Sequence, residues 1–247
     1  KGLGDLDKAS QSFKKVTELN PNFAEGFNNI GAVLKNQGKL DEAIEAFKKA
    51  LSIKSDYAGA YNNMGNALQE QGKLDEAIAS FKKALSLQPD NAKAYNNIGT
   101  TLQDQGKLDE AIASFNKALS LQPNYAEAYN NIGTALQEQG KLEEAITSYN
   151  KALSLKLNYA DAYNNMGITL QEQGKLEEAI EAFNKALSLK PDYADAHNNI
   201  GTTLQDQGKL DEAIVAYTKA LAIKPDYAEA YNNMGNALQE QGELDEA

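Results

Sequence analysis

The polar side chains that recur most regularly in this sequence are pairs of adjacent asparagines. Pairs such as Asn62-Asn63 and Asn96-Asn97 return every 34 residues. A carboxamide both donates and accepts hydrogen bonds, so it can match the alternating groups of a polypeptide backbone. Asparagine is also a poor residue for the interior of a helix, and its regular presence there needs a reason. The asparagine pairs are therefore the first candidates for a binding surface.

Candidates for catalysis or metal binding are few. His197 is the single histidine and stands where other copies of the repeat carry tyrosine, so we interpret it as a packing variant. The sequence contains no cysteine, and acid pairs such as Asp109-Glu110 recur in every copy, which suits helix starts better than one acid/base site. We expect that this chain is not itself an enzyme and that it binds no cofactor and no metal.

The charge balance narrows the range of partners. The chain has 24 lysines, no arginine and 35 acidic residues, which give a net charge of −11. We expect no nucleic-acid binding and no membrane binding, because anionic phosphates attract a basic surface. No apolar stretch is long enough for a membrane span, and a cytoplasmic location is the weak expectation. The chain begins at Lys1 and reads as a fragment.

The spacing of apolar residues predicts the elements that position these side chains. Ala126 to Gln139 carries an apolar stripe at helical spacing, Gly140 interrupts it, and a second stripe runs to Lys156. Each copy is therefore a helical hairpin, and we expect helix caps at residues such as Asn124, three positions before an acid. Residues 1–23 are predicted as the second half of a repeat, 24–227 as six full repeats and 228–247 as a truncated repeat.

These hairpins resemble the tetratricopeptide repeat family. The family signature of aromatic, glycine, alanine, aromatic and proline positions matches one copy at Tyr61, Met64-Gly65, Leu68, Ala77, Phe81 and Pro89. The resemblance covers essentially the whole chain. It implies an all-α solenoid of helical hairpins, coiled as a right-handed superhelix with the first helices on the concave face.

The same residues have a packing role in this interpretation. Gly65 and Ala77 are small because the two helices of a hairpin approach closely there. Phe81 and Tyr61 are expected to fill space against the next hairpin. One hairpin cannot bury both of its faces, so stacking continues along the chain.

The helical wheel places both asparagines of each pair on the arc opposite the apolar stripe, in two columns. A structural explanation is that an amide bonds across to the neighbouring helix and fixes the stacking. The functional explanation is that the columns bind an extended peptide, and the pattern resembles the asparagine ladder in the repeat arm of O-linked N-acetylglucosamine transferases. The predicted peptide-binding residues are Asn29, Asn63, Asn97, Asn131, Asn165, Asn199 and Asn233 in the second column, with Asn62, Asn96, Asn130, Asn164 and Asn198 in the first.

The leading functional hypothesis is a protein-interaction scaffold that holds a peptide or a partner surface on its concave face. The alternatives are a substrate-recruiting, non-catalytic arm of a larger glycosyltransferase-like enzyme and a self-assembling spacer with head-to-tail contacts. The first helices carry eleven acids and two lysines, a net charge of 2 − 11 = −9, so neutral to basic partners are favoured. Lysine and arginine clamps for an acidic C-terminus, as in chaperone-associated members of the family, are missing.

Overall fold

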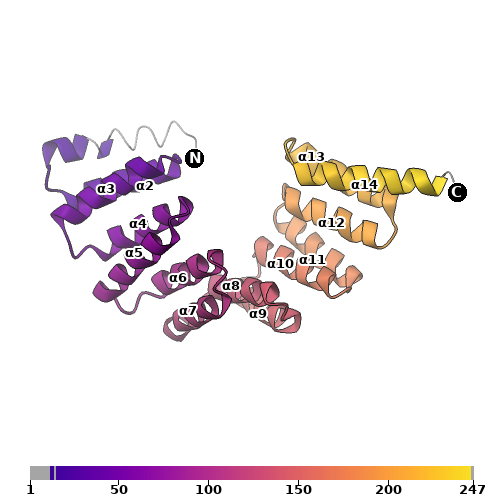
Figure 1. Cartoon of the computed structure of the whole chain (residues 1–247), viewed down its shortest axis with the longest axis horizontal. Helices are drawn as coiled ribbons and strands as arrows, with labels where there is room; N and C mark the ends of the chain where they lie inside the picture. Colours follow the sequence, from indigo (N-terminus) through magenta and orange to yellow (C-terminus); the bar gives the residue numbers. More distant parts are fainter. Residues whose placement is uncertain (1–11, 14, 246–247) are drawn as a thin grey trace. The chain divides into compact units, whose positions relative to one another are not determined.

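The computed structural model describes residues 12–13 and 15–245, and all regular structure in these residues is helical (Figure 1). Each repeat contributes a first helix of 13 residues and a second helix of 14, apart from the longer last helix. The helices are α2 (Ala24–Asn36), α3 (Leu40–Ile53), α4 (Ala58–Glu70), α5 (Leu74–Leu87), α6 (Ala92–Asp104), α7 (Leu108–Leu121), α8 (Ala126–Glu138), α9 (Leu142–Leu155), α10 (Ala160–Glu172), α11 (Leu176–Leu189), α12 (Ala194–Asp206), α13 (Leu210–Ile223) and α14 (Ala228–Asp245).

The turn inside each hairpin is a Schellman motif that needs its glycine. In the first complete hairpin the amide of Lys39 donates to the carbonyl of Leu34, and Gly38 donates to Lys35. This geometry puts Gly38 in the left-handed region at φ 75°, which side chains with a Cβ adopt only at a cost in free energy. The glycine of the repeat therefore ends the first helix and sets the direction of the second.

A second glycine lets the two helices of a hairpin touch. A Cβ built on Gly65 would lie 2.5 Å from a ring carbon of Phe81, and Gly31 meets Phe47 in the same way. The predicted close approach at Gly65 is thus confirmed. Phe81, however, packs against the first helix of its own hairpin, because it is the second helix that carries the ring to the glycine.

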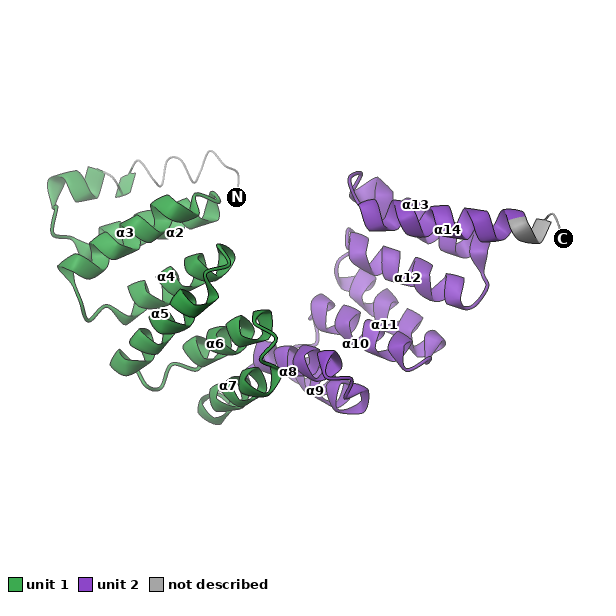
Figure 2. Cartoon of the chain, viewed as in Figure 1, with its two compact units in different colours: residues 1–123 green, residues 124–247 purple. Residues whose placement is uncertain are grey.

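The chain forms two compact units, residues 1–123 and 124–247 (Figure 2). In the first unit, α3 packs between α2 and α4, and α5 packs between α4 and α6. In the second unit, α9, α11 and α13 each lie between consecutive first helices in the same manner. First helices also contact one another within each unit, so each unit has a layer of first helices and a layer of second helices. None of the helices in the described residues is both long and apolar enough to cross a membrane.

The predicted helix caps are wrong at most joints. The helix that follows Asn124 has Tyr125 at its N-cap, and no side chain there accepts a capping bond. Tyrosine occupies this place because its ring packs at the joint between repeats, as Tyr159 does beside Leu153. Asn91 replaces tyrosine before α6, and its side chain accepts a bond from the amide of Ala94 at 3.1 Å.

The last helix also differs from expectation. The sequence predicts a helix from Ala228 to Gln241 and a break at Gly242, but α14 continues to Asp245. Gly242 does not adopt the left-handed conformation of its counterparts. In the complete hairpins the turn is followed by a second helix that packs against the first.

Candidate functional site

The two asparagine columns hydrogen-bond to each other across consecutive first helices. In the first unit, Nδ2 of Asn63 donates to Oδ1 of Asn28 at 3.0 Å. In the second unit, Asn165 donates to Asn130 at 3.2 Å and Asn199 donates to Asn164 at 3.1 Å. Partners in these bonds are 35 residues apart, one repeat plus one residue. The cross-helix amide bond that offered a structural explanation of the asparagines is therefore present.

The columns differ in exposure, which the helical wheel did not predict. Members of the first column are buried, from Asn62 at 8% exposed to Asn198 at 1%. Members of the second column from Asn29 to Asn233 are half-buried. The wheel placed both columns on the outer arc, but the neighbouring first helix covers the first of them. Within each unit the structure thus brings the predicted residues together as a ladder with an inner and an outer member.

The ladder fixes which group the outer member presents. Because Nδ2 of each bonded second-column residue is directed at the preceding helix, its Oδ1 is the group left for other partners. Asn97 uses Nδ2 twice, toward Asn62 at 3.3 Å and toward Asn66 at 2.9 Å. Within the described residues, no hydrogen bond reaches Oδ1 of Asn63, Asn97, Asn165, Asn199 or Asn233. At these five positions the outer column therefore presents carbonyl acceptors, whereas Oδ1 of Asn131 accepts from Nδ2 of Asn130 at 3.4 Å.

A second ladder runs along the C-terminal half of the first helices, and the sequence analysis missed it. Nε2 of Gln69 donates to Oδ2 of Asp104 at 2.7 Å, and Gln171 donates to Asp206 at 2.8 Å. The same offset of 35 residues recurs in the bond from Gln205 to Glu240 at 2.7 Å. The signal for it was a glutamine that directly precedes an acid in every copy after the first, where Lys35 and Asn36 stand instead. These bonds hold exposed carboxylates in a regular row on the first-helix layer.

Two buried tyrosines connect the second helices to this layer. The hydroxyl of Tyr149 donates to Oε1 of Gln137 at 3.2 Å, and Tyr217 donates to Gln205 at 2.9 Å. Phenylalanine fills this position in the other complete hairpins. Burial raises the pKa of Tyr149 to about 12, so the hydroxyl keeps its proton and acts as a donor.

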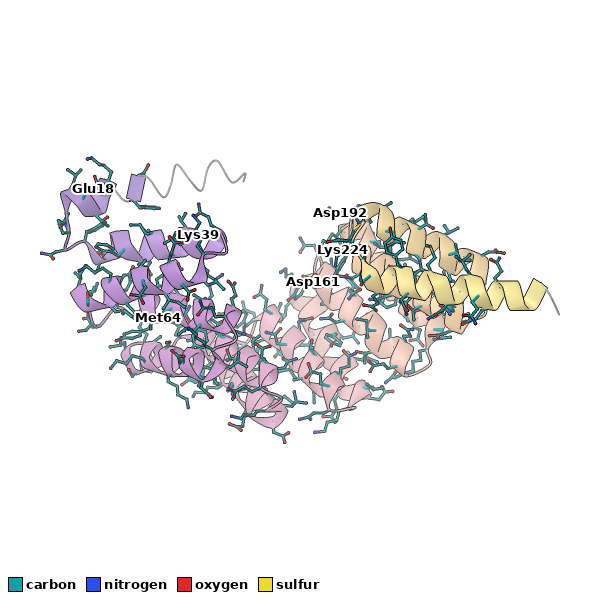
Figure 3. All side chains as sticks on the ribbon, turned by 45° about the horizontal axis from the view of Figure 1, so that its top comes forward. Glu18, Lys39, Met64, Asp161, Asp192 and Lys224 are labelled. Carbon is teal, nitrogen blue, oxygen red and sulfur yellow. The ribbon has the colours of Figure 1, made fainter. Side chains whose placement is uncertain are left out.

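The joints between repeats carry a lysine above a tyrosine ring. Nζ of Lys156 lies 4.1 Å from the ring centroid of Tyr159 and 3.6 Å from Oε1 of Glu127. Lys224, labelled in Figure 3, lies 4.4 Å from the ring of Tyr227. Burial, with Glu127 as the next cause, raises the pKa of Tyr159 to about 12. These lysines are thereby held at the joints.

No metal site is formed by the residues that the structure describes: no group of three or more histidine, aspartate or glutamate side chains is arranged to hold an ion. His197 is half-buried, and burial lowers its pKa, with a bond to the backbone of Pro191 acting in the opposite direction. It lies in the column of aromatic residues, as expected of a packing variant.

Comparison with known proteins finds repeat families along the chain. Models described as "Tetratricopeptide repeat" match residues 56–124, 90–158, 125–192 and 170–215. A model described as "TPR repeat" matches residues 3–38, 34–72 and 204–242. No curated protein matches the chain.

Solved structures show the same architecture. The chain is 21% identical to a chain of the APC/C hetero-tetramer Cut9-Hcn1, with a TM-score of 0.81 over 95% of this chain. It spans 46% of that chain's length. MamA is 33% identical over 67% of this chain and 97% of its own, with a TM-score of 0.57. YrrB, described as a TPR protein with an unusual peptide-binding site, is 29% identical over 76% of this chain and 97% of its own, with a TM-score of 0.55.

The hairpin geometry, the close approach of glycine and aromatic ring, and these matches agree. The family models together cover nearly the whole chain. This chain belongs to the tetratricopeptide repeat family, and its fold is an all-helical solenoid of tetratricopeptide hairpins.

Proposed function

We propose that this chain is a protein-interaction scaffold whose first-helix layer holds an extended polypeptide by its backbone. Tetratricopeptide repeat proteins generally mediate protein–protein interactions, and one similar structure is described as having a peptide-binding site. The observation that carries the proposal is the set of five second-column Oδ1 atoms, those of Asn63, Asn97, Asn165, Asn199 and Asn233, which accept no hydrogen bond from the described residues while their amide nitrogens donate to the preceding first helix. A carbonyl in that position is suited to accept from a backbone N–H.

The spacing of the row suits an extended chain. First helices that contact each other pack at about 8–10 Å between axes. An extended peptide rises about 3.3 Å per residue, so about every third residue would bring an N–H to one asparagine. The first column supports this arrangement from below, because its buried Oδ1 atoms orient the second-column amides. The proposal therefore assigns contact to the second column and positioning to the first.

The acid row adds a charge preference to the site. Glutamines such as Gln171 hold the carboxylates of the next repeat in place, and Lys35 forms a 2.7 Å ion pair with Glu70. Most of the acids on first helices are exposed. A peptide with lysine or arginine side chains gains attraction along this row, whereas an acidic peptide is repelled. Neutral to basic segments are the proposed partners.

The experiment begins with selection of a decapeptide ligand from a random displayed library, followed by backbone N-methylation of each position in turn. We expect about every third N-methyl group to weaken binding, because it removes an N–H donor. At about 0.5–1.5 kcal/mol for each lost bond, three such changes together lower the affinity by about tenfold or more. Equal tolerance at all positions would contradict backbone recognition.

Substitutions in the protein separate the acceptor from the rest of the side chain. Alanine at Asn165 and Asn199 removes the acceptors and should weaken binding, whereas aspartate keeps an acceptor oxygen but loses the Nδ2 that orients it, and it should preserve only part of the binding. Asn116 and Asn150 are exposed asparagines on second helices, and their change to alanine is the matched control. Urea unfolding of each variant measures the stability that is lost with the ladder hydrogen bonds, so that weaker binding can be distinguished from weaker folding. If the control pair weakens binding as much as the ladder pair, the first-helix layer is not the site.

Self-association is a second candidate, favoured by the surface of α14. Tyr231 and Leu238 are 52% and 49% exposed, and no atom lies within 4 Å of a Cβ built on Gly235. We propose that this face packs against the opposite end of another copy, head to tail. Light scattering should then show mass that grows with concentration, and Leu238→Glu should reverse it. A concentration-independent monomer would exclude it.

A further inference from the structure

A groove lies between consecutive second helices in the second unit. First helices α10 and α12 contact each other directly, whereas no Cα atom of α11 lies within 8 Å of a Cα atom of α13, both of which are fully described. The space between α11 and α13 has a volume of about 370 Å³, and residues of α12 form its floor. Ile200 and Leu204 of α12 supply buried apolar surface at the floor, and Leu187 of α11 supplies a wall.

Two departures from the repeat meet in this groove. His197 stands where the other copies carry tyrosine or phenylalanine, and it lines the groove from α12. Val215 stands where the preceding copies carry glutamate, alanine or threonine, and it lines the groove from α13. The two positions are far apart within the repeat. Their convergence on one surface distinguishes this groove from the rest of a nearly uniform array.

Two of the equivalent grooves lack both departures. Between α9 and α11 the same positions are Tyr163 and Glu181, and the groove has a volume of about 280 Å³. Between α3 and α5 the position of Val215 is taken by Ala79, and the volume is about 270 Å³. Histidine is smaller than tyrosine, and valine removes a charge at the mouth. The groove beside α13 is larger than these two, and it differs from both at His197 and Val215.

Val215 extends the apolar surface out of the groove. Its side chain is 54% exposed, although valine is a poor choice for an open helix surface. A single exposed apolar residue needs no explanation, but this one continues the buried surface of Ile200 and Leu204 toward solvent. The result is an apolar surface that runs from floor to rim.

The charges on the rim indicate the chemistry of an occupant. Asp211 and Glu212 are exposed in the first turn of α13, at one end of the groove, and Lys219 lies about two turns along the same helix. We propose that this groove binds a segment of a partner polypeptide in which aliphatic side chains lie beside a lysine or arginine. The aliphatic groups fill the space next to Val215, and the cation meets the acidic end. A second copy of this chain is disfavoured by its net charge of −11.

This site lies between second helices, and the inference does not depend on the proposed function of the first-helix layer. The probe is the peptide acetyl-Lys-Ala-Leu-Leu-Ala-Lys-amide, titrated into the ¹⁵N-labelled full chain. We expect amide shifts at residues around the groove, such as His197, Val215 and Lys219, and these shifts are followed separately from any that the basic peptide causes along the asparagine columns. Peptides with serine for leucine or glutamate for lysine should bind about tenfold more weakly or not at all.

The chain provides its own matched variants. His197→Tyr with Val215→Glu gives this groove the residues of the preceding one, which the fold already accepts at Tyr163 and Glu181. This variant should lose peptide binding by about tenfold or more. The reverse change, Tyr163→His with Glu181→Val, should create a second binding groove between α9 and α11. The gain of binding cannot be explained by a loss of folding.

The outcomes are distinct. Amide shifts around the groove that survive His197→Tyr with Val215→Glu, or that appear equally with the serine peptide, would overturn the proposal. So would absence of binding to the unaltered chain. Sedimentation velocity tests the alternative occupant, a second copy of this chain. If a second copy binds in the groove, the chain should form dimers that dissociate in the Val215→Glu variant. That result would also refute a basic aliphatic segment as the ligand.

Discussion

Replacing Gly65 by alanine should destabilise the α4–α5 hairpin, although alanine is the better helix former. The new Cβ would lie 2.5, 2.7 and 2.8 Å from three ring carbons of Phe81, whose side chain is fully buried. Overpacking of this kind costs about 1–3 kcal/mol, and we expect the upper part of that range because the ring has no solvent side toward which to move. The higher helix propensity of alanine offsets about 1 kcal/mol of this cost, so the free energy of unfolding should fall by about 1–2 kcal/mol.

Gly235 provides the matched control at the equivalent position of α14. A Cβ built there meets no atom within 4 Å, because no aromatic ring from a second helix covers it. Gly235→Ala therefore retains only the propensity term and should stabilise by about 1 kcal/mol. The same chemical change should thus have opposite signs at two equivalent positions.

Urea unfolding followed by circular dichroism at 222 nm measures the shift in midpoint for both variants. A solenoid can unfold region by region, so hydrogen exchange of α4 and α5 locates the effect of Gly65→Ala. Exchange should accelerate in that hairpin and its neighbours and should change little in α14.

A compensating change tests the cause directly. Phe81→Leu shortens the side chain that the new Cβ would strike, so the double variant with Gly65→Ala should lose less stability than the sum of the single changes. Additive losses, or a Gly65→Ala variant as stable as Gly235→Ala, would refute the idea that close approach is the reason for this glycine.

Three further changes test the caps, the buried hydroxyl and the ladder. Asn91→Ala should lower stability by about 1 kcal/mol because it removes a side-chain cap, whereas Asn124→Ala should have little effect, as measured by urea unfolding. Burial raises the pKa of Tyr149 to about 12, while an unfolded tyrosine ionises near 10. The folded state therefore keeps the proton to a higher pH than the unfolded state does. Its stability should be unaffected below about pH 9 and should fall between about pH 10 and 12, and the fall should be less steep in Tyr149→Phe. Unfolding midpoints measured across this pH range check the sign. Asn164→Ala should cost about 1–3 kcal/mol because it leaves a neighbouring amide without its acceptor, whereas Asn232→Ala, at an exposed position, should be neutral or slightly stabilising in the same assay.

The elements that depend on local spacing could be predicted from the sequence. Apolar residues at helical spacing and glycines such as Gly140 define a hairpin whatever lies beside it. The contact at Gly65 was also predictable, because only a small residue permits such an approach. These features follow from the chain within one repeat, which is the range over which a periodic pattern is informative.

Features that depend on how repeats stack were not predictable in the same way. A helical wheel separates Asn130 and Asn131 by about 100°, and it cannot show which of them the next first helix covers. The wheel also gives no direction to an amide, yet it is the bond from Asn165 to Asn130 that leaves a carbonyl oxygen on the surface. The capping error at Asn124 has the same origin, since the tyrosine ring at the joint is positioned by the preceding repeat.

In an array this uniform, a residue that departs from the repeat is more informative than one that conforms. A conforming residue such as Asn199 is explained by stacking alone, because every repeat needs its bond to the helix before it. Asn91 departs from tyrosine and replaces the joint contact with a helix cap. His197 and Val215 depart together and alter one groove, with no cap or ladder bond to account for them. Selection that acted only on stacking would leave such changes scattered over the surface, so their convergence is the reason to test that groove for a partner of its own.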